Sequence, residues 1–254
     1  MTTHALSDTG VLTGRSLRHI LRSPDTIITT AVTPIALMLL FVYVLGGAIT
    51  TGTDESYLNY MLPGILLITI ASGIAYTAYR LFLDMQGGIF ERFQSMPISR
   101  SSVLWAHVFT SLTANMVSIA IVVGVALIMG FRTGASVVAW IAVAGILVLF
   151  TLSLTWIAVI AGLSAKTVDG ASAFSYPLIF LPFISSAFVP TDTMPAPVAW
   201  FAENQPVTSI VNTIRALFAG EPVGGDIWIA LAWLIGILVV AYGFAIAIYR
   251  RKVS

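Results

Sequence analysis

The feature that most constrains this chain is a set of six long stretches without a single charged side chain. A transmembrane helix needs about 20 consecutive, mostly apolar residues. No Asp, Glu, Lys or Arg occurs within residues 26–53, 56–79, 101–131, 133–165, 170–191 and 227–249. Charged residues make up only 9% of the chain, whereas a water-soluble domain has about 25%. The sequence therefore predicts an all-α membrane protein with six transmembrane helices, at 27–49, 58–83, 103–130, 136–164, 171–190 and 227–249.

The positive charges fall mainly on one side of this predicted bundle. Ten of the twelve Lys and Arg residues precede the first span, follow the sixth, or lie in the loops after the second and fourth: Arg15, Arg18, Arg22, Arg80, Arg92, Arg100, Lys166, Arg250, Arg251 and Lys252. Arg132 and Arg215 fall on the opposite side. Because Lys and Arg gather in cytoplasmic loops, we expect both termini in the cytoplasm. We expect the protein to be one domain, residues 1–254, in the plasma membrane.

Two segments outside the spans have helical patterns of their own. In residues 10–22, three arginines share one face and Leu17 and Leu21 another, which predicts an amphipathic helix on the inner membrane surface. A solvated tail is the alternative. In the outer segment 191–226, apolar residues recur at helical spacing from Val207 to Phe218. This pattern predicts an amphipathic outer helix, which we expect to end at Gly220 because glycine commonly terminates helices.

Two of the spans contain residues that shape helices. The fifth is barely long enough to cross and has three prolines, Pro177, Pro182 and Pro190. Proline removes a backbone donor and clashes with the preceding turn, so we expect this span to be bent or broken. The fourth contains small residues, among them Gly145 and Gly162, which are typical of positions where membrane helices approach closely.

A polar stretch, DMQGGIFERFQSMPISR at 84–100, separates the second and third spans. Its apolar residues fall on one helical face: Ile89, Phe90, Phe93 and Met96. Pro97 cannot continue the pattern. We therefore predict a short cytoplasmic amphipathic helix at 88–96. It has to cover its apolar face either on another protein or on the lipid headgroups.

The sequence lacks the common catalytic and nucleotide-binding motifs. GxxxxGK[ST], HExxH and GxSxG do not occur, there is no cysteine, and His4, His19 and His107 are far apart in the sequence. We therefore predict neither an enzyme nor a metal site. Ion-driven transporters place ionisable residues inside the bundle, and the middles of these spans have none. If the protein moves a substrate uphill, the energy has to come from outside the membrane.

Two stretches of the sequence resemble the type-2 permease family of ABC exporters. The first is YLNYMLPGILL at 57–67, followed by the polar stretch at 84–100. The second, SSAFVPTDTMPAPVAWFAENQPVTSIVNTIRALFAG at 185–220, is similar to the outer segment of the daunorubicin-resistance branch. It departs from that branch at Gln205-Pro206, where Asn-Pro is common. Together with the six spans and the amphipathic start, the resemblance covers nearly the whole chain.

This resemblance implies that residues 88–96 are the coupling helix, which sits in a groove of a separate ATP-binding subunit. The expected contact residues are Gly88, Ile89, Phe90, Glu91, Arg92, Phe93, Met96, Pro97 and Arg100. It also implies two copies of that subunit, which bind ATP and Mg²⁺, and a second permease that we expect to be identical. We expect membrane lipids around the protein, no cofactor in this chain and no nucleic acid partner.

The same resemblance implies export of amphipathic drugs, antibiotics or lipids, with multidrug or antibiotic resistance as the outcome. Hydroxyl and aromatic side chains in the spans suit such substrates. The candidates for lining the pathway are Tyr60, Ser72, Tyr76, Ser153, Thr155 and Tyr176. Ordinary packing between helices is the alternative role for each. Two other functions stay open: a permease for polysaccharides or lipid-linked glycans, and a non-transporting membrane anchor or sensor for a cytoplasmic ATPase.

Overall fold

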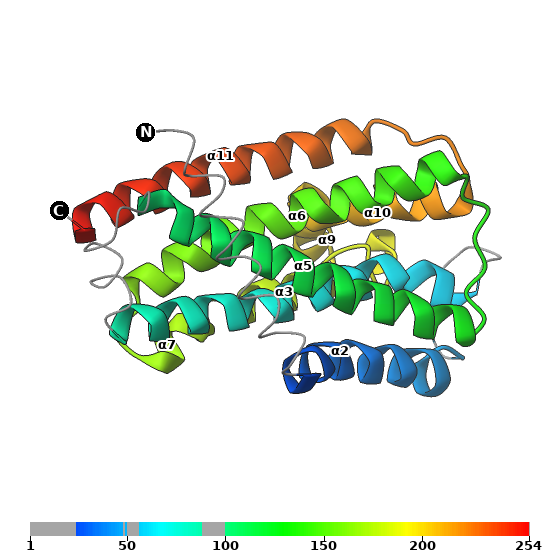
Figure 1. Ribbon diagram of the computed structural model, residues 1–254. Helices are drawn as coiled ribbons and strands as arrows, with labels where there is room; N and C mark the ends of the chain where they lie inside the picture. The colour runs from blue at the N-terminus through cyan, green and yellow to red at the C-terminus, as the bar shows by residue number, and fades with distance from the viewer. Residues whose placement is uncertain (1–23, 48, 50–55, 88–99, 254) are drawn as a thin grey trace.

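The computed structural model describes residues 24–47, 49, 56–87 and 100–253, and within them it contains helices and no strand (Figure 1). The elements are α2 (Pro24–Leu39), the π-helix η1 (Leu40–Leu45), α3 (Tyr57–Gln86), α5 (Arg100–Ile128), α6 (Val137–Ser164), α7 (Val168–Ala173), α8 (Ser175–Phe180), the 3₁₀-helices η2 (Leu181–Ile184) and η3 (Thr191–Thr193), α9 (Ala196–Asn204), α10 (Pro206–Ala219) and α11 (Asp226–Val253). The predicted all-α fold is thus confirmed. The predicted helices at 10–22 and 88–96 lie outside the described residues.

Four of the described helices are long and apolar enough to cross a membrane. They are α3, residues Leu104–Ile128 of α5, α6, and residues Asp226–Arg251 of α11. These helices overlap the predicted spans 58–83, 103–130, 136–164 and 227–249. Two shorter apolar helical segments, Ala31–Leu45 and Val168–Ile184, fall where the first and fifth spans were predicted.

The segment predicted as the fifth span is broken into three short helices. Phe174 separates α7 from α8, and the 3₁₀-helix η2 continues directly from α8. Pro177 is the third residue of α8 and Pro182 the second of η2, positions near helix starts where proline's missing N–H costs little. The prediction of a bent or broken helix is therefore confirmed.

The outer segment forms two short helices, α9 and α10. Gln205 begins α10 by accepting a hydrogen bond from the backbone N–H of Val207 at 3.0 Å. Gly220 ends it in the left-handed conformation, with a φ of 76° that favours glycine. The apolar face of α10 is buried within the molecule, and Ile210 and Ile214 have no exposed surface. The amphipathic helix predicted from the spacing, and its end, are confirmed.

Helix α3 forms the centre of the bundle. It contacts α2, α5, α6, α7, α8 and α10. In its most apolar window 78% of the residues are buried, against 22% in α11. In Figure 1, α2 runs along one edge of the bundle and α11 along the opposite edge, with α6 next to α11. The packing of six other described helices therefore depends in part on α3.

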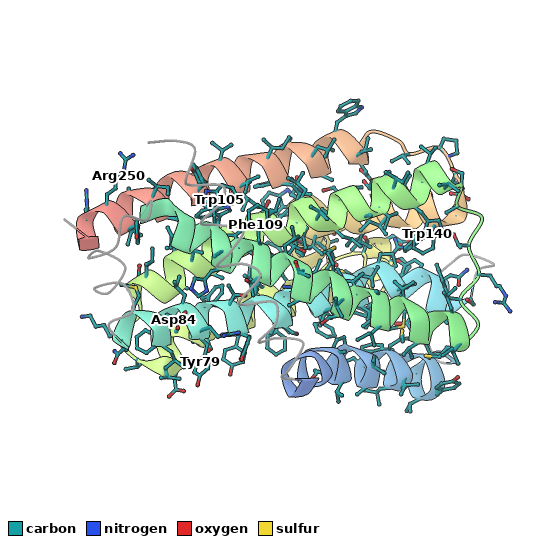
Figure 2. The ribbon with its side chains drawn as sticks, viewed as in Figure 1. Tyr79, Asp84, Trp105, Phe109, Trp140 and Arg250 are labelled. Carbon is teal, nitrogen blue, oxygen red and sulfur yellow. The ribbon has the colours of Figure 1, made fainter. Side chains whose placement is uncertain are left out.

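An aromatic cluster joins α5, α6 and α11. The rings of Trp105 and Trp156 meet edge to face with centroids 5.3 Å apart, and Trp156 meets Tyr242 in the same way at 4.8 Å. Such pairs contribute about 0.5–1.5 kcal/mol beyond the area that they bury. Trp105 points from α5 toward these helices in Figure 2. The cluster adds to the packing of α11 on α6.

Gly162 allows α6 to lie directly on α3. A Cβ added at this position would come within 2.8 Å of the backbone oxygen of Ala78 and 3.2 Å of Leu81. A backbone oxygen cannot move aside without moving its helix. The two helices therefore approach at a distance that no larger residue permits, as predicted for Gly162. Gly145 on the same helix has nothing within 4 Å of a built Cβ, so it has no such role within the described structure.

We expect Gly162→Ala to destabilise the protein by about 1–3 kcal/mol, since overpacking a close helix contact forces the backbone to shift. Gly145→Ala is the matched control, and we expect it to leave the stability unchanged or to raise it by up to about 1 kcal/mol, because alanine is the better helix former. Thermal unfolding in detergent, followed by tryptophan fluorescence, measures both. Equal stability of the two variants would contradict the assigned contact.

Candidate functional site

The predicted coupling helix is bounded by two described helices. Eight of the nine predicted contact residues, from Gly88 to Pro97, lie outside the described residues; the ninth, Arg100, is the first residue of α5. Helix α3 ends at Gln86, where the N–H of Gly87 donates to the carbonyl of Leu83 at 2.8 Å. In Figure 1 the end of α3, the start of α5 and the end of α11 all lie at the same end of the bundle. We call it the inner end, and the opposite end the outer end, after the orientation that the positive charges predict.

A polar side-chain contact joins α3 and α5 near the inner end. Nε2 of His107 lies 3.1 Å from Oδ2 of Asp84. The two side chains are 17% and 32% exposed, so water screens the contact only partly. One turn earlier on α3, the guanidinium of Arg80 lies 5.7 Å from the centre of the Tyr76 ring, within cation–π range. Figure 2 shows Asp84 on the inner half of α3.

A hydroxyl network connects α3, α5 and α6 in the interior. Thr77 donates to Ser111 at 2.8 Å, and the hydroxyls of Ser111 and Thr155 lie 3.3 Å apart. Thr155 also donates to the carbonyl of Thr151 on its own helix at 2.7 Å. All of these side chains are at most 7% exposed. The network gives these hydroxyl groups the hydrogen-bond partners that lipid cannot provide.

A second polar cluster lies at the outer end, around Arg215 of α10. Its Nε and Nη2 donate to the carbonyl of Tyr60 at 3.2 and 3.1 Å, and Nη2 also donates to the carbonyl of Ser186 at 2.7 Å. Nη1 donates to Oδ1 of Asn212 at 3.1 Å. The guanidinium carbon lies 3.8 Å from the centre of the Tyr60 ring, a close cation–π contact. One side chain therefore ties α10 to α3 and to the turn after η2.

The sequence patterns did not indicate that either the Asp84–His107 contact or the cluster around Arg215 is a site. The available signal for Arg215 was its place in the charge map, as one of two positive residues in the predicted outer loops. Asp84 and His107 each occur near a predicted inner helix end, but their pairing depends on how α3 and α5 pack. Among the residues that the structure describes, no three His, Asp or Glu side chains gather as metal ligands would.

The structure divides the six candidates for the pathway into two groups. Tyr60, Ser153 and Thr155 are at most 5% exposed and make contacts inside the bundle. Ser153 donates to the carbonyl of Leu234 on α11 at 2.9 Å. Ser72 and Tyr76 of α3 are partly exposed, and Tyr176 of α8 is 61% exposed. Since α8 packs on α3, the second group belongs to neighbouring helices.

The class of the protein follows from this architecture. Long apolar helices surround an interior in which none of the buried side chains in the described part is Asp, Glu, Lys or Arg. Such a bundle is a multi-pass α-helical membrane protein.

Comparison with known proteins identifies the family. The model of the ABC-2 type transporter family matches residues 7–219. The chain is 27% identical to the daunorubicin resistance ABC transporter permease protein DrrB1 of Streptomyces coeruleorubidus over 233 residues, which are 90% of this chain and 81% of that protein. The chain therefore belongs to the ABC-2 type transporter family and is similar to its drug-resistance permeases, as the two sequence stretches predicted.

Proposed function

We propose that this chain is the permease subunit of an ATP-driven exporter that moves amphipathic drugs, antibiotics or lipids out across the plasma membrane. The observation that carries this proposal is the family match over residues 7–219 together with similarity to a permease named for daunorubicin resistance. The hydroxyl and aromatic side chains of Ser72, Tyr76 and Tyr176, which are at least partly exposed, support it, because such a surface suits large apolar molecules with scattered polar atoms.

The proposed topology has six spans and two cytoplasmic termini. Four spans correspond to the long helices α3, α5, α6 and α11. The shorter segments Ala31–Leu45 and Val168–Ile184 are the proposed first and fifth spans. The second of these contains the two helix breaks, which neighbouring helices have to support inside a membrane. The excess of Lys and Arg at the inner end supports the orientation.

The proposed energy source is a separate ATP-binding subunit in two copies, with ATP and Mg²⁺ bound there and hydrolysed there. Residues 88–96 are the proposed coupling helix, with Phe90, Phe93 and Met96 in the groove and Glu91 and Arg92 at its rim. The position of α3 and α5 supports this, since both flank residues 88–96 at the inner end. A second copy of this permease completes the proposed assembly. Rocking of the two bundles between two states would open the pathway alternately to the inside and to the outside.

Ser72, Tyr76 and Tyr176 are the proposed pathway residues. They are partly or largely exposed on α3 and α8, which pack together. We expect Tyr176→Ala to lower the rate of drug export by about fivefold, the factor for one aromatic contact of about 1 kcal/mol. The matched control is Phe244→Ala on α11, because Phe244 is also 61% exposed. Helix α11 lies at the opposite edge of the bundle from α7, the helix that directly precedes α8 (Figure 1). Equal export rates in the two variants would contradict the assignment of Tyr176.

Transport into inside-out membrane vesicles tests the function itself. The chain is expressed with an ABC ATP-binding subunit, and daunorubicin is the first probe because a similar permease is named for it. The expected result is uptake that requires both subunits and ATP. ATP hydrolysis without movement of daunorubicin or of a fluorescent lipid would contradict export of amphipathic molecules. It would favour the anchor or sensor function, whereas uptake of a lipid-linked glycan alone would favour the glycan permease.

A further inference from the structure

Along the inner half of α3, its antiparallel contact with α5 includes small and polar residues beside the apolar ones. Three pairs face each other: Gly73 with Asn115, Thr77 with Ser111, and Asp84 with His107. The three members are four and seven residues apart on α3 and four residues apart on α5, so on each helix they share one face. We call these three pairs the polar seam.

Two of the pairs are direct polar contacts. Thr77 Oγ1 donates to Ser111 Oγ at 2.8 Å, and both side chains are at most 7% exposed. His107 Nε2 lies 3.1 Å from Asp84 Oδ2. Interhelical hydrogen bonds inside a membrane hold helices together because lipid offers no competing donor or acceptor. The two contacts therefore oppose separation of α3 and α5.

The third pair fixes the register between the two helices. Asn115 is 2% exposed, and its Nδ2 donates to the carbonyl of Ser111 at 2.9 Å. Its Oδ1 lies against Gly73 so closely that a Cβ there would collide with it. A slide of α5 by one turn along α3 would bring Asn115 against Thr69 or Thr77, which have side chains at the same face. Gly73 therefore leaves more room for Asn115 than the threonines one turn away do, which favours the observed register.

The seam lies where the two helices meet the predicted coupling helix. Asp84 is two residues from the end of α3 at Gln86, and His107 is in the second turn of α5. The residues between these helices are those proposed above to contact the ATP-binding subunit. We propose that the polar seam makes α3 and α5 one rigid unit, which carries movement of the coupling residues into the membrane core. Asp84 and His107 are positioning residues in this unit, and the inference rests on the proposed function.

A disulfide across the seam tests the rigidity. The chain has no cysteine, so Thr77→Cys with Ser111→Cys introduces the two thiols that replace the hydroxyls 2.8 Å apart. Membranes containing the chain and its ATP-binding subunit are oxidised with and without ATP. We expect the same extent of cross-linking in both conditions. A several-fold lower extent in either condition would overturn the proposal. Thr77→Cys with Leu112→Cys is the control, because position 112 faces about 100° away on α5.

The coupling between hydrolysis and export tests the role of Asp84. We expect Asp84→Ala to lower the number of substrate molecules exported per ATP by about threefold, the factor for one interhelical hydrogen bond. Asp84→Asn, which can still bond to His107, should keep the wild-type ratio, and the Thr77–Ser111 disulfide should restore it in Asp84→Ala. A merely structural role would lower the amount of complex and leave the ratio unchanged, which would overturn the proposal.

The two proposals fail in different ways. If the wild-type complex exports no amphipathic probe, the proposed function is wrong, and the extent of cross-linking with and without ATP still decides whether α3 and α5 move as one. If the wild type exports but the oxidised variant with Thr77→Cys and Ser111→Cys does not, and a reductant restores export in that variant, the function holds and the rigid unit is wrong.

Discussion

Arg215→Ala is expected to lower the free energy of unfolding by about 3 kcal/mol, the largest stability effect of any substitution considered for this chain. The guanidinium donates to two backbone carbonyls and one side-chain amide, and it lies over an aromatic ring. Ser186 lies outside any helix, so its carbonyl is not part of a helical hydrogen-bond ladder. Losing the guanidinium leaves partly buried acceptors without their charged donor, and α10 loses these hydrogen bonds to α3.

Two control variants separate the geometry of Arg215 from its charge. Arg215→Lys keeps the charge, but one ammonium cannot reproduce the planar fork that reaches Tyr60, Ser186 and Asn212 together. We expect it to recover less than half of the lost stability. Arg132→Ala removes the other outer arginine, whose side chain is exposed, and should change stability by less than about 0.5 kcal/mol. Thermal unfolding in detergent compares all three. A wild-type melting temperature for Arg215→Ala would show that the cluster does not support the fold.

Local patterns in the sequence predicted the long helices of the fold and some of the shorter ones. The uncharged stretches predicted helices where α3, α5, α6 and α11 are found. Pro177 and Pro182 predicted the breaks in the fifth segment because proline acts on its own backbone and the preceding turn. Gly220 and the apolar spacing of α10 predicted that helix and its end. In each case the physical cause lies within a few residues of the effect.

Contacts between distant residues could not be predicted in the same way. Tyr60 and Arg215 are 155 positions apart, and nothing local to either indicates the other. The pairing of Asp84 with His107 depends on how α3 and α5 pack, and Asn115 lies directly against Gly73 at the same contact. In the sequence, Gly73 and Asn115 are positions with no visible relation to each other.

The pathway candidates illustrate the same limit on a single residue type. Ser72, Ser153 and Thr155 have similar hydroxyl chemistry, and the sequence places all three in uncharged spans. In the structure, Ser153 and Thr155 bond to backbone carbonyls with no exposed surface, while Ser72 is partly exposed. The residue type therefore identified hydroxyl side chains that are compatible with a membrane interior. Only the packing of the helices shows which hydroxyls bond between helices and which lie on a surface that a substrate can reach.

The largest effect on transport is expected from the predicted coupling helix. Phe90 belongs to its apolar face, and Glu91 to an adjacent side. We expect Phe90→Ala to weaken binding of the ATP-binding subunit by about 30-fold, the factor for a buried aromatic anchor worth about 2 kcal/mol. Glu91→Ala should have a smaller effect in the same direction, because a charge at the rim of an interface acts mainly on association.

Both variants should still fold and insert, because the core contacts of α3 and α5 lie outside residues 88–96. Gln94→Ala is the matched control, since Gln94 lies away from the apolar face of the predicted helix. Stimulation of ATP hydrolysis in detergent-solubilised complexes, measured at several permease concentrations, gives the apparent affinity of each variant. Wild-type stimulation in both Phe90→Ala and Glu91→Ala would mean that residues 88–96 cover their apolar face with lipid rather than with the ATPase. An energy input from the cytoplasm would then have to reach the bundle through a different part of the inner end.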